Sequence, residues 1–257
     1  ENRPGAAGTL ALGAVSRAGA DGNTLGVFAL QSAVAPNLIK AMPYDSARDL
    51  SPVRQVSTVN NVLVVRVDSP VRDSTALLRD AGHSRFTYAS AGMGTPSHLA
   101  AELFGQEVKL PFQHVPFNGP IAALSGLIGG HVDIMFATTA AALPLIRDGK
   151  LRPLAVTATR RLAALPEVPT LSELGHPNAS VRDWHGFVAP AGTPTERIEQ
   201  IAAAIGRVLT IEVVRQRLQA SGLEPLPDSG PREVRGWIDE ENDRWAAVLR
   251  RAGVTMQ

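Results

Sequence analysis

The stretch Tyr88–His98 holds the residue types best suited to binding an anion. Its letters, YASAGMGTPSH, predict a strand end, a glycine-rich turn and the start of a helix. The backbone N–H groups of such a turn, with the partial positive charge of a helix start, attract a negative group. No Lys or Arg occurs between Arg85 and Lys109, so amides, hydroxyls and water would have to hold the anion. This favours a carboxylate held reversibly, although a plain strand–helix turn has the same pattern.

Hydroxyl groups add donors to this turn. Ser90, Thr95 and Ser97 can donate hydrogen bonds. Thr95 also occupies the expected capping position of the helix, and Pro96 suits the first helical position. We therefore expect the helix to begin at Pro96.

Other chemistries fit this stretch less well. The glycines match neither G-x-x-x-x-G-K-[ST] nor a spaced G-x-G-x-x-G, so a nucleotide is a weak candidate ligand. A hydrolase elbow of the form G-x-S-x-G around Ser90 would need Gly where Tyr88 stands. His98 lies one to two turns along the following helix. A helix-face histidine that hydrogen-bonds a neighbouring loop is its more ordinary role.

Three further segments place polar residues where a strand is expected to end. His114–Pro120 predicts a strand, an Asn118-Gly119 turn with positive φ and a helix start, with Phe117 as a core alternative. Val132–Phe136 predicts a strand with Asp133 as a structural carboxylate, and it leads into Thr138 and Thr139 as donors. Phe28–Ser32 predicts a strand followed by a polar turn that holds Gln31 and Ser32. Four such turns without a catalytic pair favour a binding cleft.

The elements that must position these turns alternate along the chain. Apolar strand-like runs at 62–65 and 154–157 are separated by helical patterns at 96–104 and 120–128, the latter with Ile121, Leu124 and Ile128 on one face. This alternation predicts α/β units around mostly parallel sheets. The last quarter is mainly helical. A capping box at 193–196 precedes a stripe that includes Val208, and Ser229-Gly230-Pro231 opens a second helix.

Composition excludes several classes of function. Of 257 residues, 44% are hydrophobic and 19% charged, and the net charge of +1 lacks the basic excess of a nucleic-acid-binding protein. The absence of Cys rules out thiol catalysis and disulfides. No His/Asp/Glu set has metal-ligand spacing and no carboxylate pair suits acid–base catalysis, so we expect no metal, no cofactor and no enzyme. No apolar run approaches the ~20 residues of a membrane helix, and Glu1–Pro4 does not open a signal peptide.

A series of short motifs along nearly the whole chain resembles the Bug family, the extracytoplasmic solute receptors of tripartite tricarboxylate transporters. Their order and spacing together carry the resemblance. The motifs are Glu1–Ala6 with Gly8; Asp21-Gly22 with Thr24-Leu25; Pro43–Asp45 with Asp49-Leu50; Tyr88–Gly92 with His98-Leu99; Val115–Phe117 with Gly119; Gly149–Arg152; Leu165–Thr170; and Trp184–Gly186 with Pro190–Pro194.

The resemblance implies a Venus-flytrap fold, in which two α/β lobes are joined by two crossing strands. Val62–Val67 and Gly186–Pro190 match those crossings, which assigns residues 1–66 plus 186–257 to one lobe and 67–185 to the other. The resemblance also implies a periplasmic, monomeric binding protein. Such a protein captures a small carboxylate (a dicarboxylate, amino acid or aromatic acid) between its lobes and delivers it to membrane transporter subunits.

In such receptors, loop amides, hydroxyls and ordered waters hold the ligand carboxylate. The resemblance therefore implies ligand contacts from the strand-end turns of this chain. Those contacts are Ser90, Ala91, Gly92, Met93, Gly94, Thr95, His98, Phe117, Asn118, Gly119, Thr138 and Thr139, and the polar turn with Gln31 and Ser32 is a further candidate.

The chain departs from the family pattern in a few places. Family members usually begin with another strand and helix before the Glu1–Ala6 segment, and without that unit we expect an exposed sheet edge. Phe117 stands where Tyr is common, which removes one hydroxyl contact. Two functions compete with the receptor: a serine hydrolase that uses Ser90, and a sensor that docks on a membrane signalling partner when solute binds.

Overall fold

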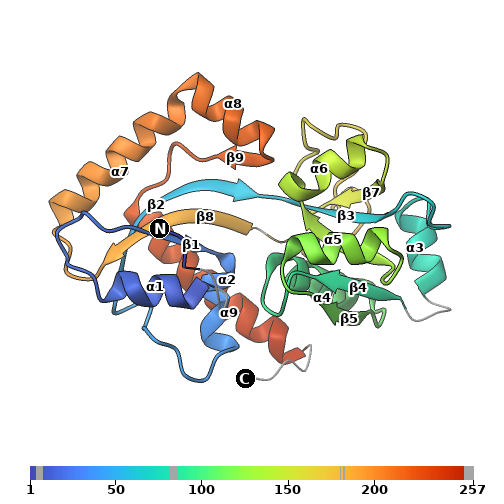
Figure 1. Cartoon of the computed structure of the whole chain (residues 1–257), viewed down its shortest axis with the longest axis horizontal. Coiled ribbons are helices and arrows are strands. Elements are labelled where there is room, and N and C mark those ends of the chain that lie inside the picture. Colours follow the sequence, from blue (N-terminus) through green and yellow to red (C-terminus); the bar gives the residue numbers. More distant parts are fainter. Residues whose placement is uncertain (4–7, 82–85, 180, 182, 252–257) are drawn as a thin grey trace. The chain divides into compact units, whose positions relative to one another are not determined.

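The computed structural model divides into two compact units (Figure 1). The structure describes residues 1–3, 8–81, 86–179, 181 and 183–251. The first unit comprises Glu1–Thr58 and Asp183–Gln257, and the second comprises Val59–Arg182. The lobe boundaries after residues 66 and 185 stay a prediction from the sequence. The strand Asn61–Arg66 pairs on both of its sides with strands of the second unit.

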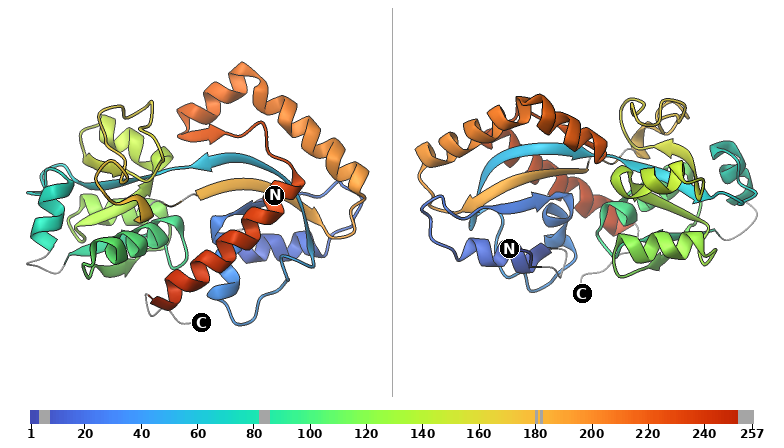
Figure 2. Two further views of the ribbon diagram at one scale, coloured as in Figure 1. Left: turned by 180° about the vertical axis from the view of Figure 1, so that it is seen from behind. Right: turned by 45° about the horizontal axis from the view of Figure 1, so that its top comes forward.

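The first unit is built on a four-stranded sheet of order β1-β8-β2-β9. Apolar side chains of α1 and α9 form a core with Phe28 and Trp184, whereas α7 packs with Val53 and Ala189 in a separate cluster. The long helix α9, red in Figure 2, also packs along α2. The elements of the first unit are α1 (Thr9–Ser16), β1 (Gly26–Ala29), α2 (Leu30–Val34), the 3-10 helix η2 (Ala35–Asn37), β2 (Leu50–Val59), β8 (Asp183–Pro190), α7 (Thr195–Thr210), α8 (Glu212–Ala220), β9 (Leu223–Pro225) and α9 (Pro231–Arg251).

The second unit is built on a five-stranded sheet of order β5-β4-β6-β3-β7. β4 is parallel to both β5 and β6, and β3 is antiparallel to both β6 and β7. The sheet is therefore mixed, and the mostly parallel arrangement predicted from the sequence holds only for β5, β4 and β6. Its elements are β3 (Asn61–Arg66), α3 (Ser74–Ala81), β4 (Thr87–Ser90), α4 (Pro96–Val108), β5 (Gln113–Pro116), α5 (Pro120–Ile128), β6 (Ile134–Thr138), α6 (Thr139–Arg147), β7 (Leu151–Val156) and the 3-10 helix η3 (Pro177–Ala179).

Helices cover both faces of this second sheet. α5 and α6 share a buried cluster with Val62, Ala89 and Met135 on one face. On the other face, Phe104 of α4 contacts Phe136 of β6 edge-on, with ring centroids 5.6 Å apart. Side chains on successive strand residues point to opposite faces, which explains why neighbouring residues meet different helices.

Several local predictions need correction. The capping box at 193–196 is wrong, because the Thr193 hydroxyl donates to the Pro190 carbonyl (2.8 Å) and α7 begins at Thr195 without a side-chain cap. Ile121 and Val208 were placed on core faces, yet they are 81% and 47% exposed. In α5 the residues that reach the sheet are Ala123, Leu124 and Leu127, so the buried face is rotated away from Ile121.

The strand β1 forms one edge of the first unit's sheet. Val27 in this strand is 59% exposed, and a groove of about 930 Å³ beside it is lined by residues of α1 and by Thr24 and Leu25. Among the described residues, no further strand pairs with β1 on this side. Within the described ranges, the structure has no helix with the length and hydrophobicity that crossing a membrane requires.

Candidate functional site

Three of the predicted turns lie at one edge of the second unit's sheet, which here means the edge formed by the carboxyl ends of its parallel strands. β5, β4 and β6 are parallel neighbours, so the turns that follow Pro116, Ser90 and Thr138 leave the same edge. Helices α5, α4 and α6 each begin within six residues of that edge. The turn residues from 91–95, 117–119 and 138–139 are therefore brought together, as the sequence analysis expected for a cleft in an α/β protein.

The turn at 91–95 is held by its own hydrogen bonds. The Ala91 amide donates to Ser97 Oγ (3.0 Å), the Gly92 amide to Ser90 Oγ (3.1 Å) and the Gly94 amide to His98 Nδ1 (3.2 Å). Gly92 has φ 123°, which permits the sharp bend after Ser90. Most of the amides that the sequence offered to an anion thus serve to fix the turn.

The helix start supplies the donors that remain for a ligand. Pro96 is the first residue of α4, as predicted, but the Thr95 hydroxyl does not cap the helix. It donates to the Gly92 carbonyl instead (2.6 Å). The N–H groups in the first turn of a helix have no partners within the helix and carry the positive end of its dipole. The residues that present such groups here are Ser97 and His98.

Ser90 forms a hydrogen bond that the sequence did not reveal. Its Oγ lies 2.6 Å from Nε2 of His114, a residue of the neighbouring strand β5. Ser90 is fully buried, and its hydroxyl also accepts the Gly92 amide. Ser90 therefore anchors the turn to the adjacent strand.

A cluster of three rings, in which Tyr88 stacks on His114 and His98 is tilted against His114, supports this anchor. The rings of His98 and His114 are 4.4 Å apart, and Tyr88 stacks on His114 at 4.8 Å. Burial lowers the pKa of His114 to about 4; burial and then the nearby His114 lower that of His98 to about 3. The Tyr88 hydroxyl donates to Glu102, and burial raises the pKa of Tyr88. The cluster is thus uncharged at neutral pH and adds no cation to the turn.

The turn after β5 is closed by its backbone. The Phe117 amide donates to the Ser90 carbonyl (3.0 Å), and Gly119 has φ 95°, as predicted for this turn. Asn118 is exposed and does not have positive φ. The Phe117 ring packs on Gly126 of α5, where an added Cβ would lie 2.5 Å from its Cζ. Phe117 therefore serves the core of the unit.

The two threonines after β6 have different environments. The Thr139 amide and hydroxyl both donate to the Asn60 carbonyl, each at 2.8 Å, and the side chain is buried. Thr138 is half-buried and pairs across the sheet with Asn61. Asp133 precedes β6 and accepts the Thr87 amide and hydroxyl, each at 2.7 Å, which fits the predicted structural carboxylate.

Gln31 and Ser32 belong to the first unit. The predicted polar turn is wrong, because both residues lie in the helix α2, which follows β1 directly. Ser32 is buried and Gln31 is half-buried.

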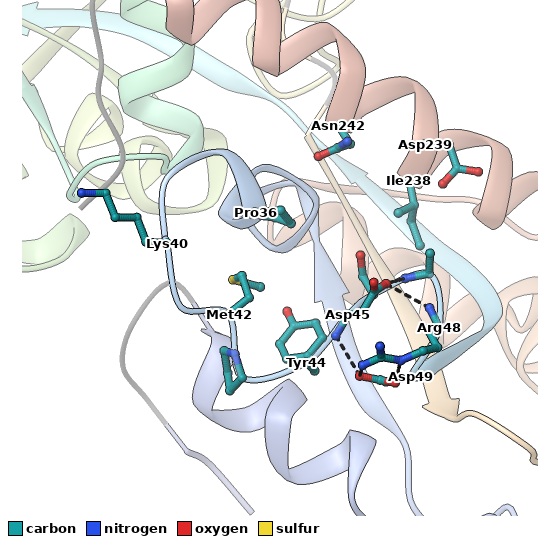
Figure 3. A pocket seen from close by; sticks show the side chains of 13 residues that line it. Pro36, Lys40, Met42, Tyr44, Asp45, Arg48, Asp49, Ile238, Asp239 and Asn242 are labelled. Carbon is teal, nitrogen blue, oxygen red and sulfur yellow. Dashed lines mark hydrogen bonds and ion pairs between the residues drawn. The ribbon is translucent and has the colours of Figure 1, made fainter.

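A separate hollow of about 560 Å³ lies within the first unit (Figure 3). Its loop is fixed by its own polar groups, since Asp49 pairs with Arg48 at 2.7 Å and accepts the Asp45 amide at 2.8 Å. The Tyr44 hydroxyl is buried without a partner among the described residues, and burial raises the pKa of Tyr44 to about 12. The motif Pro43–Asp45 with Asp49 thus builds a loop that leads into β2.

Comparison with known proteins identifies the family. Residues 1–254 match the tripartite tricarboxylate transporter family receptor, TctC. The chain is 33% identical over 252 residues to a UPF0065 protein from the tcbD-tcbE intergenic region of Pseudomonas sp., covering 97% of this chain and 75% of that protein. It is 32% identical to Protein BugT of Bordetella pertussis, covering 100% of this chain and 80% of BugT.

Solved structures agree with this match. The periplasmic binding protein BugD superposes with a TM-score of 0.88 at 28% identity, over 100% of this chain and 87% of BugD. A Rhodopseudomonas palustris protein solved with adipate gives a TM-score of 0.90 at 30% identity, over 100% and 87% of the two chains. MatC from the same organism, solved with bound malate, gives 0.85 at 32% identity, over 97% and 86%.

These relatives settle the fold and the class of protein. The two-lobed α/β fold expected from the sequence is that of the matching structures. The family consists of solute-binding receptors rather than enzymes, which removes the serine hydrolase alternative. The chain belongs to the TctC family of tripartite tricarboxylate transporter receptors, the family that includes the Bug proteins.

Proposed function

We propose that this chain is a monomeric periplasmic receptor that captures a small carboxylate and delivers it to the membrane subunits of a tripartite tricarboxylate-type transporter. The ligand class comprises dicarboxylates, amino acids and aromatic acids. The observation that supports the proposal is the meeting of three helix-starting turns at one edge of the sheet β5-β4-β6.

The electrostatics of this edge suit an anion that must also be released. The first turn of α4 supplies amides and the positive end of a helix dipole, while the two histidines of the ring cluster are neutral. The sequence holds no Lys or Arg from 86 to 108, so no salt bridge from this turn and helix holds the ligand. Two matching structures hold adipate and malate, which are dicarboxylates of different length.

A ligand screen tests the proposal. Dicarboxylates, hydroxy acids, amino acids and aromatic acids would be added singly, with thermal shift as the first measurement and calorimetry as the second. We expect one small group of acids to bind with one-to-one stoichiometry and to raise the melting temperature. The fully methylated ester of each binding acid is the matched control, and it should not bind because it carries no carboxylate. Failure of every acid to bind would contradict the proposal.

Delivery to a membrane partner is tested separately. The tagged receptor would be incubated with detergent-solubilised membranes that contain the transporter subunits, with and without the bound acid. Recovery of the transporter subunits, and a change in that recovery with ligand, supports a transport role. Recovery of a signalling protein instead would favour the sensor.

A further inference from the structure

Asn61, the first residue of β3, has a buried side chain that makes no hydrogen bond to any described residue. The residue is 0% exposed, and both Oδ1 and Nδ2 are buried without a partner among the described residues. Leaving a buried donor or acceptor unpaired is energetically costly, because the group has lost its hydrogen bonds to water. Both polar groups of Asn61 are unpaired, and the residue lies at the edge where the turns meet. This suggests that a ligand forms hydrogen bonds with them.

The backbone of Asn61 is fixed by hydrogen bonds to Thr157. Its amide donates to Thr157 Oγ1 (3.0 Å), and its carbonyl accepts the Thr157 amide (2.9 Å). Thr157 is itself buried and follows the last residue of β7. The side chain of Asn61 is thus offered from a rigid position, as a binding residue needs to be.

Register places Asn61 at the edge where the turns meet. Asn61 pairs with Thr138, the last residue of β6, and Leu63 pairs with Phe136. Because strand side chains alternate, Asn61 and Leu63 share a face, and it is the face on which Phe136 meets α4.

Ser90, the last residue of β4, can be placed relative to Asn61 through the strand β6, which lies between β4 and β3. Ala89 pairs with Met135, so Ser90 is level with Phe136, and Asn61, which pairs with Thr138, lies two residues farther toward the carboxyl end of β6. The chain passes from Ser90 through the glycine-rich turn into α4 at this level. Asn61 therefore lies on the α4 side of the sheet, toward the edge at which that helix begins.

We propose that Asn61 is a specificity-determining ligand contact, with Nδ2 donating to the ligand carboxylate and Oδ1 accepting from a hydroxyl or amine on the ligand. This inference rests on the proposed function. A plain alkanoic acid would satisfy the donor and leave the acceptor unpaired. The ligand class is therefore narrowed to carboxylic acids that carry a hydroxyl or amino group beside the carboxylate.

Matched acids test the pairing of Oδ1. Malate and succinate differ by one hydroxyl, and aspartate and succinate by one amine. Calorimetry on the wild-type protein should show tighter binding of the acid with the extra donor in at least one pair. Equal binding within both pairs, or preferred binding of succinate or adipate, would overturn the narrowed ligand class.

Two variants test the residue itself. Asn61→Leu and Asn61→Ala should each weaken binding of the preferred acid about tenfold or more, the loss expected when a hydrogen bond to a charged group is removed. They should also erase the preference within its pair. Asn61→Leu should raise the melting temperature of the ligand-free protein, because an unpaired amide has been replaced by an apolar group. Asn61→Ala serves if the larger Leu side chain does not fit.

A control variant at Asn178 shows whether a change in affinity is specific to Asn61. Asn178 is exposed, and its Nδ2 donates to Glu107 near the last turn of α4, the opposite end from Pro96. Asn178→Leu should leave affinity unchanged. Wild-type binding that both Asn61 variants retain would overturn this inference alone. Absence of any binding by the wild-type protein would overturn the proposed function and this inference with it.

Discussion

Ser90 and His114 are 24 residues apart in the chain, yet the Ser90 Oγ and the His114 Nε2 lie 2.6 Å from each other. The pair has the geometry of a serine with its general base. Its surroundings are different from those of a nucleophile, because Ser90 is fully buried and its hydroxyl receives the Gly92 amide. The contact fixes the turn before α4, which makes it a positioning interaction for the ligand site.

Replacing Ser90 by Ala should weaken ligand binding and stability together. The change leaves His114 Nε2 and the Gly92 amide without their partner, which costs about 1 kcal/mol for each of the two lost hydrogen bonds because both residues are half-buried. Urea unfolding and calorimetry measure the two effects. Ser125→Ala, at an exposed position of α5, is the control and should change neither. Ester hydrolysis by the wild-type protein that disappears in Ser90→Ala would contradict this role.

His114 should make stability depend on pH below neutrality. Burial lowers its pKa from the ordinary 6.5 to about 4, so the unfolded chain takes up the proton first as the pH falls. The stabilising contribution is complete above about pH 6.5 and is lost as the pH falls toward 4. His114→Gln, which keeps a polar group near Ser90, should make this decline shallower. Urea unfolding across that pH range measures it, and equal slopes for both proteins would contradict the prediction.

Local features of the fold were predictable from the sequence. The helix 120–128 has the predicted bounds, and the helix from Pro96 extends to Val108 rather than Phe104. Proline at a helix start and apolar residues at helical spacing are signals within one segment, so they can be read without knowing the fold. Such local signals do not show how a helix is rotated against the sheet. The expectation that Ile121 lies in the core was wrong for this reason.

The partners within the site were not predictable in this way. His114 meets Ser90 because β5 and β4 are neighbours, and Asn61 reaches the edge because β3 runs antiparallel to β6. Strand order and register are set by packing between distant segments, and a shift by one residue moves every side chain to the other face. The turn at 91–95 was located correctly, but three of its amides donate hydrogen bonds to the side chains of Ser90, Ser97 and His98.

Asp183 should make the protein less stable as the pH rises. Burial, with a smaller contribution from the charge of Glu241, raises the pKa of Asp183 from 3.8 to about 7. The unfolded chain therefore loses the proton first, and stability falls between about pH 4 and pH 7 and then levels off. Asp183→Asn keeps an oxygen for the Trp184 amide, which Oδ1 accepts at 2.8 Å.

The Asp183→Asn variant should be more stable than the wild type above pH 7, by on the order of a few kcal/mol, and similar to it near pH 4. Urea unfolding at both ends of the range measures the difference. Asp228→Asn makes the same change of charge at an exposed position and should show no such crossover. Equal stability of Asp183→Asn and the wild type at all pH values would count against a buried, protonated carboxyl.

Gly206→Ala should destabilise the first unit through Arg54. The buried guanidinium of Arg54 donates to the carbonyls of Ala202, at 3.0 Å, and of Pro227, and so joins α7 to the segment before α9. A Cβ at Gly206 would lie 2.8 Å from Arg54 Cζ and displace the group from both carbonyls. We expect a loss of about 1–3 kcal/mol in the free energy of unfolding. Gly236→Ala in α9, where a Cβ meets no atom within 4 Å, should instead gain about 0.5–1 kcal/mol from helix propensity. A gain in both variants by urea unfolding would show that Arg54 can move aside without cost.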